Sequence, residues 1–207
     1  MKIESRVYHL KGFTPLLGSQ PASDRIRSEF IASKAPTPEL GDAETEMLPE
    51  DADKGMTVFL RDTDSTLILM DYAIVGYFKS AITALKSENG IAQAKSKVGT
   101  YLFVEPRAIP IYQEGDPVVK PDEVLERPLR AETMKGPRVS LAASELVKDP
   151  WEITITVKLL ENEGTAKSKR LTFDAVENAL DYGALKGLGQ WRNGGYGRFT
   201  WERVDKA

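Results

Sequence analysis

The chain has 207 residues, 41% of them hydrophobic, which is enough to bury one core. It has no cysteine and one histidine, which excludes disulfides, thiolate chemistry and a metal site built from histidines within one chain. No run approaches the roughly 18 apolar residues of a membrane span, and the first residues lack a signal-peptide core. We therefore expect a soluble, cytoplasmic protein with one domain over 1–207, and without a cofactor, a metal or a membrane partner.

The net charge of −3 is unevenly distributed along the chain. Seven acids and no Lys or Arg lie between Thr37 and Asp53, and removing them from the total leaves a net charge of +4 on the rest. Attraction to phosphate acts within about a Debye length, roughly 8–10 Å. A local basic surface can therefore bind nucleic acid although the total charge is negative.

The N-terminal segment begins with alternating apolar and polar residues over 3–17, which predicts a first strand centred on 6–17. Gly12 and Pro15 indicate a bulge in this strand or its end. A short helix is expected at 23–33. At 34–54, prolines, acids and small residues predominate without periodicity, so we expect an exposed acidic insertion.

The next part of the chain predicts a hairpin followed by a helix. Residues 56–61 and 65–70 are strand-like and flank the turn Asp62-Thr-Asp64. Gly76 is expected to form the turn that opens a helix over 76–87. An extended run over 99–112 follows this helix.

The C-terminal half contains a long excursion, a strand and a second helix. Residues 113–136 are rich in Pro, Gly and charge, and we interpret them as an inserted basic hairpin or loop. Alternation over 151–160 predicts the clearest strand. A three- and four-residue apolar period behind Thr172 predicts a capped helix over 173–186, and a last strand is expected over 196–203.

Five glycines lie between this helix and the last strand, at 187, 189, 194, 195 and 197. Such density favours a shaped backbone surface over a slack linker. A dinucleotide-binding glycine loop follows a strand and opens a helix, so the order here excludes a Rossmann motif, and no P-loop pattern is present. Two interpretations of the loop remain: an anion-binding surface with an aromatic that stacks on a base, or a turn packed against a helix with its aromatics in the core.

Without its insertions, the chain has the order β-α-β-β-α-β, which predicts an α+β, ferredoxin-like domain. The spacing G-x-G-x-x-x-x-x-G-x-G at Gly187, Gly189, Gly195 and Gly197 resembles the glycine-rich loop of the RAMP superfamily, the RNA-binding proteins of CRISPR systems. In that family the loop joins the second helix to the last strand of a ferredoxin-like fold. Residues 74–81 also resemble the family's Gly-x-x-hydrophobic-Lys turn, which would place Lys79 at a helix start, where free N–H groups can meet a phosphate.

The resemblance implies a subunit that coats single-stranded guide RNA in a multi-subunit CRISPR complex and performs no chemistry on it. In such subunits a long inserted hairpin kinks the guide, a role that the 113–136 excursion would take here. The residues expected to contact RNA are Lys79, Arg127, Arg130, Arg138, Lys186, Gly187, Gly189, Trp191, Arg192, Gly195, Tyr196, Gly197 and Arg198. RNA or single-stranded DNA, and a host complex or a viral counterpart, remain open at this point.

Three alternatives compete with RNA coating. His9 would be the general base of a metal-independent endoribonuclease, as in some RAMP proteins, if it faced the RNA. A structural assembly protein would bind no nucleic acid. The Asp62-Thr-Asp-Ser-Thr66 stretch resembles the D-x-D-x-T motif of haloacid-dehalogenase-type phosphohydrolases, but the residues after Thr66 are strand-like and no second acidic motif has suitable spacing. We interpret Asp62 and Asp64 as turn residues.

Overall fold

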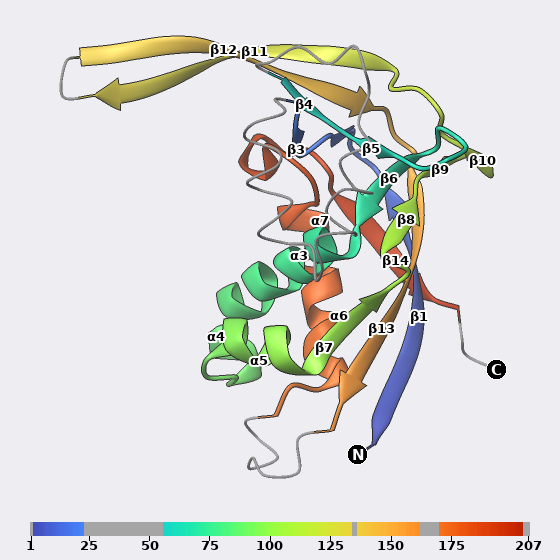
Figure 1. Cartoon of the computed structure of the whole chain (residues 1–207). Coiled ribbons are helices and arrows are strands. Elements are labelled where there is room, and N and C mark those ends of the chain that lie inside the picture. Colours follow the sequence, from blue (N-terminus) through green and yellow to red (C-terminus); the bar gives the residue numbers. More distant parts are fainter. Residues whose placement is uncertain (1, 23–55, 134–135, 162–169, 205–207) are drawn as a thin grey trace.

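The computed structural model describes residues 2–22, 56–133, 136–161 and 170–204, and for 129–141 it describes the backbone alone (Figure 1). The predicted helix at 23–33 and the acidic insertion at 34–54 lie outside the described residues. Among the helices that the structure describes, none is long and apolar enough to cross a membrane. The same residues contain no group of three or more His, Asp or Glu that could hold a metal ion.

The central sheet joins four segments that are far apart in the sequence. β1 (Ile3–Gly12) pairs with β13 (Glu152–Leu160) on one side and with β14 (Phe199–Arg203) on the other. β13 pairs in turn with β7 (Leu102–Glu105). All three pairings are antiparallel, so these four strands lie in the order β7-β13-β1-β14. Two short strands extend the same six-stranded sheet, since β9 (Tyr112–Gln113) also pairs with β13 and β10 (Asp116–Pro117) pairs with β9.

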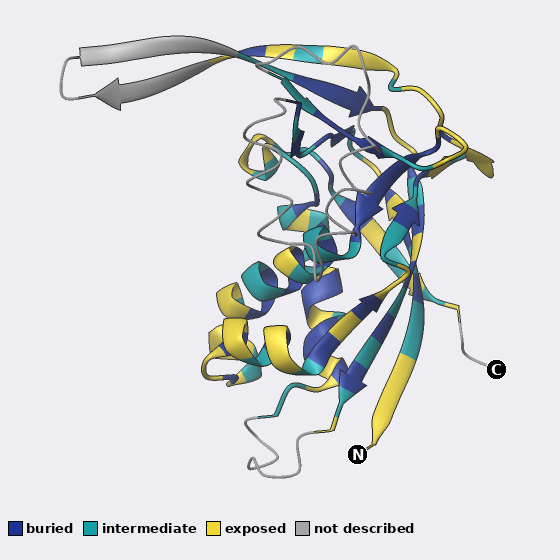
Figure 2. Cartoon of the chain, viewed as in Figure 1, coloured by how far each residue is buried: buried dark blue, intermediate teal, exposed yellow. Residues whose placement is uncertain are grey.

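Alternation along the strands gives this sheet one apolar and one polar face. Leu10 on β1 and Ile155 on β13 are buried on the face against which α3 (Asp71–Ala84) and α6 (Phe173–Asp181) pack. Figure 2 shows this burial pattern, with the helices on one side of the sheet only. No element that the structure describes covers the other face.

The predicted helix over 173–186 is present as two consecutive helices. Thr172 caps α6, and its Oγ1 accepts a hydrogen bond from the N–H of Ala175 at 3.4 Å. α6 ends at Asp181, and α7 (Gly183–Lys186) follows. Gly183, the first residue of α7, lets the Phe199 ring pack against the helix backbone, because a Cβ there would lie 2.2 Å from that ring.

The first predicted helix begins earlier than expected, which corrects the interpretation of Gly76. α3 starts at Asp71, directly after β6 (Leu67–Met70), and Gly76 lies inside it rather than in a turn. The expected extended run over 99–112 is also wrong at its start, where α5 (Ala94–Tyr101) ends. The remaining elements of this region are α4 (Lys86–Asn89), β8 (Ala108–Pro110), β9 (Tyr112–Gln113) and β10 (Asp116–Pro117).

The basic excursion forms a long hairpin, and it extends further than predicted. β11 (Glu123–Thr133) pairs with β12 (Gly136–Val147) along its full length, and the hairpin reaches beyond the body of the protein (Figure 1). The base of β12 also pairs with β4 (Met56–Val58) and with β2 (Leu16–Leu17). β3 (Gln20–Pro21) completes this second sheet.

The predicted hairpin around Asp62 is confirmed. β5 (Leu60–Arg61) pairs with β6, and β6 pairs with β8 in a third, small sheet. The Oδ1 of Asp62 accepts hydrogen bonds from the N–H groups of Asp64 at 3.0 Å and Thr66 at 2.8 Å. Asp62 is therefore a turn residue.

The first strand is shorter than the predicted 6–17, because the chain changes sheet after Gly12. A Cβ at Gly12 would lie 2.0 Å from the Trp151 ring, so the glycine lets this fully buried indole pack against the backbone. Trp151 Nε1 then donates to the carbonyl of Thr14 at 2.8 Å. The next residues, Leu16 and Leu17, belong to β2 and pair with β12.

Candidate nucleic-acid interface

The glycine loop, residues 187–198 between α7 and β14, is attached to the segment that follows β1. The N–H of Gly197 donates to the carbonyl of Pro15 at 2.8 Å, and the N–H of Arg198 donates to Thr14 Oγ1 at 2.8 Å. The N–H of Gln190 donates to the carbonyl of Leu17 at 3.3 Å. Because Leu17 also pairs with β12, residues 14–17 hold the glycine loop and the base of the hairpin together.

The glycine spacing corresponds to real backbone requirements. Gly187, Gly189, Gly195 and Gly197 all have positive φ, between 71° and 89°. A Cβ at Gly187 would lie 2.3 Å from the carbonyl oxygen of Tyr196, and one at Gly197 would lie 2.1 Å from that of Leu188. The loop therefore closes on its own backbone, as only glycine permits at these two positions.

The loop's N–H groups are mostly engaged inside the protein, which corrects the expectation that they cradle successive phosphates. Those that donate to protein acceptors are the N–H groups of Gly187, Leu188, Gln190, Gly194, Gly195, Gly197 and Arg198. These groups are not available to a phosphate in this conformation. The side chains of the loop must supply most of any binding.

Two aromatic side chains of the loop form a stack near its tip. The rings of Trp191 and Tyr196 are 5.2 Å apart between centroids and 17° from parallel. Trp191 is 39% exposed, whereas Phe199 is fully buried in the core. Trp191 of the loop therefore lies partly at the surface, whereas Phe199, the first residue of β14, lies in the core.

The hairpin contributes Arg127 to the same place. Its Cζ lies 4.7 Å from the centroid of the Trp191 ring, within the range of a cation–π contact. Its Nη1 donates to Ser144 Oγ at 3.0 Å, and Ser144 Oγ lies 2.7 Å from Thr57 Oγ1. Ser144 and Thr57 are supporting residues that sequence analysis missed, because only the pairing of β12 with β4 brings them together.

Three further cations lie in the glycine loop or beside it in the sequence. Lys186 Nζ donates to Asn193 Oδ1 at 3.3 Å, and the Arg198 guanidinium lies beside Gly195, where a Cβ would be 3.6 Å from it. Arg192 belongs to the short helix η2 (Arg192–Gly194) of the loop. Between Asp181 and Glu202 the sequence has no acid at all. None of these three cations, nor Arg127, is ion-paired with a carboxylate of the described residues.

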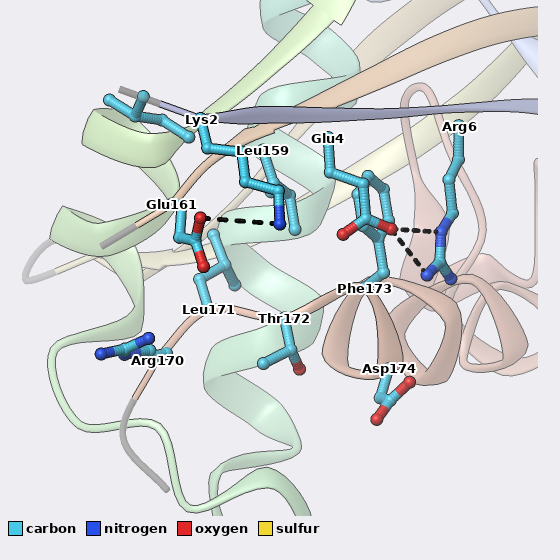
Figure 3. A pocket seen from close by; sticks show the side chains of 11 residues that line it. Lys2, Glu4, Arg6, Leu159, Glu161, Arg170, Leu171, Thr172, Phe173 and Asp174 are labelled. Atoms are coloured by element: carbon cyan, nitrogen blue, oxygen red, sulfur yellow. Dashed lines mark hydrogen bonds and ion pairs between the residues drawn. The ribbon is translucent and has the colours of Figure 1, made fainter. Parts of the chain in front are cut away.

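The pocket in Figure 3 provides a contrast. It lies between the start of β1, the end of β13 and the start of α6, and it contains several charged side chains. Here the cations face acids: Lys2 Nζ lies 3.9 Å from a Glu161 oxygen, and Arg6 lies 2.8 Å from a Glu4 oxygen (Figure 3). Arg6 also pairs with Glu177 at 2.8 Å. The charges of this pocket are internally balanced, unlike those around the glycine loop.

His9 lies on the uncovered face of the central sheet, within a small polar network. Its Nδ1 is 3.2 Å from Thr154 Oγ1, and its Nε2 is 3.6 Å from a Glu152 oxygen. Lys11 Nζ binds the other Glu152 oxygen at 3.1 Å. By strand alternation, the charged residues of this face are Lys11, Glu105, Glu152, Lys158 and Glu202. Among these residues acids outnumber Lys and Arg, and both lysines are paired with acids, so they give this face no excess positive charge.

Three other predicted contact residues lie elsewhere or are only partly described. Lys79 is in the middle of α3, not at a helix start, and its Nζ lies beside Gly99 of α5, where a Cβ would be 3.3 Å away. The expectation of a phosphate site at Lys79 and free N–H groups is therefore wrong. Arg130 and Arg138 lie on β11 and β12, one register step apart, and their side chains are outside the described part.

Comparisons with known proteins give a fold and no sequence family. No protein-family model matches the chain, and no curated protein matches its sequence. Among solved structures, a chain of a "Type IV-B CRISPR Complex" matches with a TM-score of 0.53 at 9% identity, over 99% of this chain and 92% of that one. A chain of the "Type III-B Cmr-beta bound to cognate target RNA" matches with a TM-score of 0.46 at 9% identity, over 99% of this chain and 62% of that one. The predicted resemblance to subunits of CRISPR complexes is confirmed at the level of the fold.

Proposed function

We propose that this chain is a non-catalytic, RAMP-like subunit of a CRISPR-type ribonucleoprotein complex, which binds single-stranded guide RNA where the glycine loop meets the β11–β12 hairpin. The sheet order β7-β13-β1-β14, with α3 between β1 and β7 in the chain and α6 between β13 and β14, supports a ferredoxin-like core. The fold shared with a Type IV-B CRISPR complex chain supports the same assignment.

The observation that carries the proposal is a set of loop cations without a carboxylate partner among the described residues, together with a partly exposed aromatic stack in the same loop. Lys186, Arg192 and Arg198 have no carboxylate partner among the described residues, so their charges remain available to phosphates. An unpaired base can stack on the part of this aromatic pair that the contact between Trp191 and Tyr196 and the contact with Arg127 leave exposed, an interaction worth roughly 1–3 kcal/mol. Stacking of this kind requires splayed bases, so it favours a single strand over a duplex.

A salt series tests the proposal. Binding of labelled single-stranded RNA, single-stranded DNA and duplex RNA of one sequence is measured by fluorescence anisotropy. We expect the affinity for RNA to fall as salt rises. The double variant Arg192→Gln/Arg198→Gln should bind more weakly, and its slope of log K against log salt should be shallower by about 0.7 for each phosphate contact that is lost. The matched control is Lys11→Gln/Lys158→Gln on the uncovered sheet face, which changes the charge equally and should leave binding intact.

Two results would overturn the proposal. Absence of binding to either single strand at low salt would make the chain a structural assembly protein, with the glycine loop as a packing feature. Cleavage of the RNA during incubation, lost in His9→Ala, would contradict the non-catalytic assignment and support the endoribonuclease alternative.

A further inference from the structure

Two arginines of the second and third sheets differ sharply in how their charges are balanced. Arg61 on β5 pairs with Glu145 of β12, with 2.6 Å between Nη2 and Oε1, and it also donates to the carbonyl of Phe59. Arg127 on β11 is 6% exposed, has no carboxylate partner among the described residues, and has an Nε that is buried without an acceptor. Within the described residues, the guanidinium of the partly buried Arg61 is balanced by a carboxylate, whereas that of the buried Arg127 is not.

The surroundings of Arg127 accommodate its charge only in part. Ser144 Oγ accepts one hydrogen bond, and the Trp191 ring offers the negative face of its π system. Neither group carries a negative charge. Burial lowers the pKa of Arg127, against a weaker opposing influence of Tyr196, which means that the fold disfavours the charged form. Arginine nevertheless stays protonated in proteins, so Arg127 keeps a positive charge that no carboxylate of the described residues balances.

A phosphodiester is the ligand that fits this site. A planar guanidinium can bind two phosphate oxygens as a fork, and such charge-assisted bonds are among the strongest in proteins. In this structure Nη1 of Arg127 already donates to Ser144 and Nε is buried, so a phosphate must approach Nη2 or take the place of Ser144. Trp191 lies directly beside it, so one nucleotide can place its base near the indole and its phosphate near the guanidinium. Lys186, Arg192 and Arg198 continue the positive charge along the loop.

We propose that Arg127 is kept in the free protein as an uncompensated buried charge which a backbone phosphodiester of the bound strand neutralises. Binding of the RNA strand and docking of the β11–β12 hairpin onto the glycine loop are then thermodynamically coupled. This inference rests on the proposed function. It adds that Arg127 lowers the stability of the free protein and raises its affinity for RNA. An arginine that serves only to anchor Trp191 would stabilise the free protein instead.

The test compares Arg127→Met with Arg61→Met, which remove the same charge and keep a long apolar side chain. For Arg127→Met we expect a free protein at least as stable to urea as the wild type, because a buried unbalanced charge is gone. Its RNA affinity should fall, its salt slope should be shallower by about 0.7, and RNA should raise its melting temperature less. For Arg61→Met we expect a less stable protein, because Glu145 is left buried without a cation. The dependence of its RNA affinity on salt should be unchanged.

Arg127→Lys provides a second readout that does not depend on tolerating an apolar residue. It keeps the charge and loses the fork, so the salt slope should be retained while affinity falls. The inference is overturned if Arg127→Met is less stable than the wild type and keeps the full slope, or if Arg127→Lys loses the slope. Wild-type protein that binds no RNA would defeat the proposed function and this inference together, whereas binding that is indifferent to Arg127 would defeat this inference alone.

Discussion

The guanidinium carbon of Arg127 lies 4.7 Å from the centre of the Trp191 ring, and this contact joins the long hairpin to the glycine loop. Residues 14–17 also hold these two parts together. Pro15 and Leu17 accept hydrogen bonds from the loop, and Leu16 and Leu17 pair with β12. The proposed binding surface is therefore assembled from three segments, and none of them forms it alone.

Trp191 should matter for binding and little for folding. We expect Trp191→Ala to weaken single-stranded RNA binding by about 1–3 kcal/mol, because it removes the stacking platform. The matched control is Phe103→Ala, which removes another exposed aromatic, 51% accessible, from the uncovered sheet face. Affinity measured by anisotropy should be unchanged in the control. Equal losses in the two variants would place the RNA elsewhere.

Gly197 should be intolerant of any side chain. Gly197→Ala puts a Cβ 2.1 Å from the carbonyl oxygen of Leu188 and places a non-glycine residue at a φ of 71°. The left-handed conformation alone costs roughly 1–2 kcal/mol, and the collision adds to it. Gly195→Ala is the control, because its φ is also positive while its nearest atom is 3.6 Å away. Urea unfolding should show Gly197→Ala as clearly the less stable variant, and equal stabilities would contradict the loop geometry.

Gly76 gives the opposite expectation. It lies inside α3 and is exposed, and a Cβ there would meet nothing within 4 Å. Gly76→Ala should therefore raise the free energy of unfolding by about 0.5–1 kcal/mol, because alanine loses less backbone entropy in a helix. Thermal denaturation checks this. A destabilised variant would show that Gly76 forms the turn that its sequence pattern suggested.

Tyr77 makes stability depend on alkaline pH. Its hydroxyl donates to the carbonyl of Ala179, and burial raises the pKa of Tyr77 above its usual value of 10.0. Above that pH the unfolded chain releases a proton that the folded protein retains, so the folded state binds more protons and the free energy of unfolding falls as pH rises. Tyr8, whose pKa is also raised by burial, acts in the same direction.

The test is urea unfolding at several pH values between about 8 and 11, a range that spans the ordinary tyrosine pKa. Tyr77→Phe should show a shallower fall in stability at the alkaline end than the wild type, although it loses a hydrogen bond at every pH. Parallel curves for the two proteins would mean that the phenol ionises equally in the folded and unfolded states.

Local pattern predicted the strands of the central sheet, because each buries alternate residues on one face. It misplaced the start of α3, since Asp71 follows the apolar strand residue Met70 with no glycine or proline to mark the boundary. It missed α5, whose stretch Ala-Lys-Ser-Lys-Val-Gly-Thr-Tyr buries only Ala94 and Val98 and so has little helical periodicity.

In the candidate site too, the local sequence predicts some features and not others. The glycine spacing corresponds to four positive φ values, because positive φ is a local property that only glycine meets without strain. The contact of Arg127 with Trp191 depends on how the hairpin docks, and no local pattern encodes it. The phosphate site expected at Lys79 is wrong for a related reason: it required α3 to begin near Gly76, whereas α3 begins at Asp71.

Photo-crosslinking of bound single-stranded RNA, followed by mapping of the modified peptides, tests the central claim most directly. The account predicts crosslinks at Trp191 or Tyr196, with β11 as the neighbouring site, and their loss when Arg192 and Arg198 are both replaced by glutamine. Crosslinks confined to the uncovered face of the central sheet, around His9 and Phe103, would contradict it.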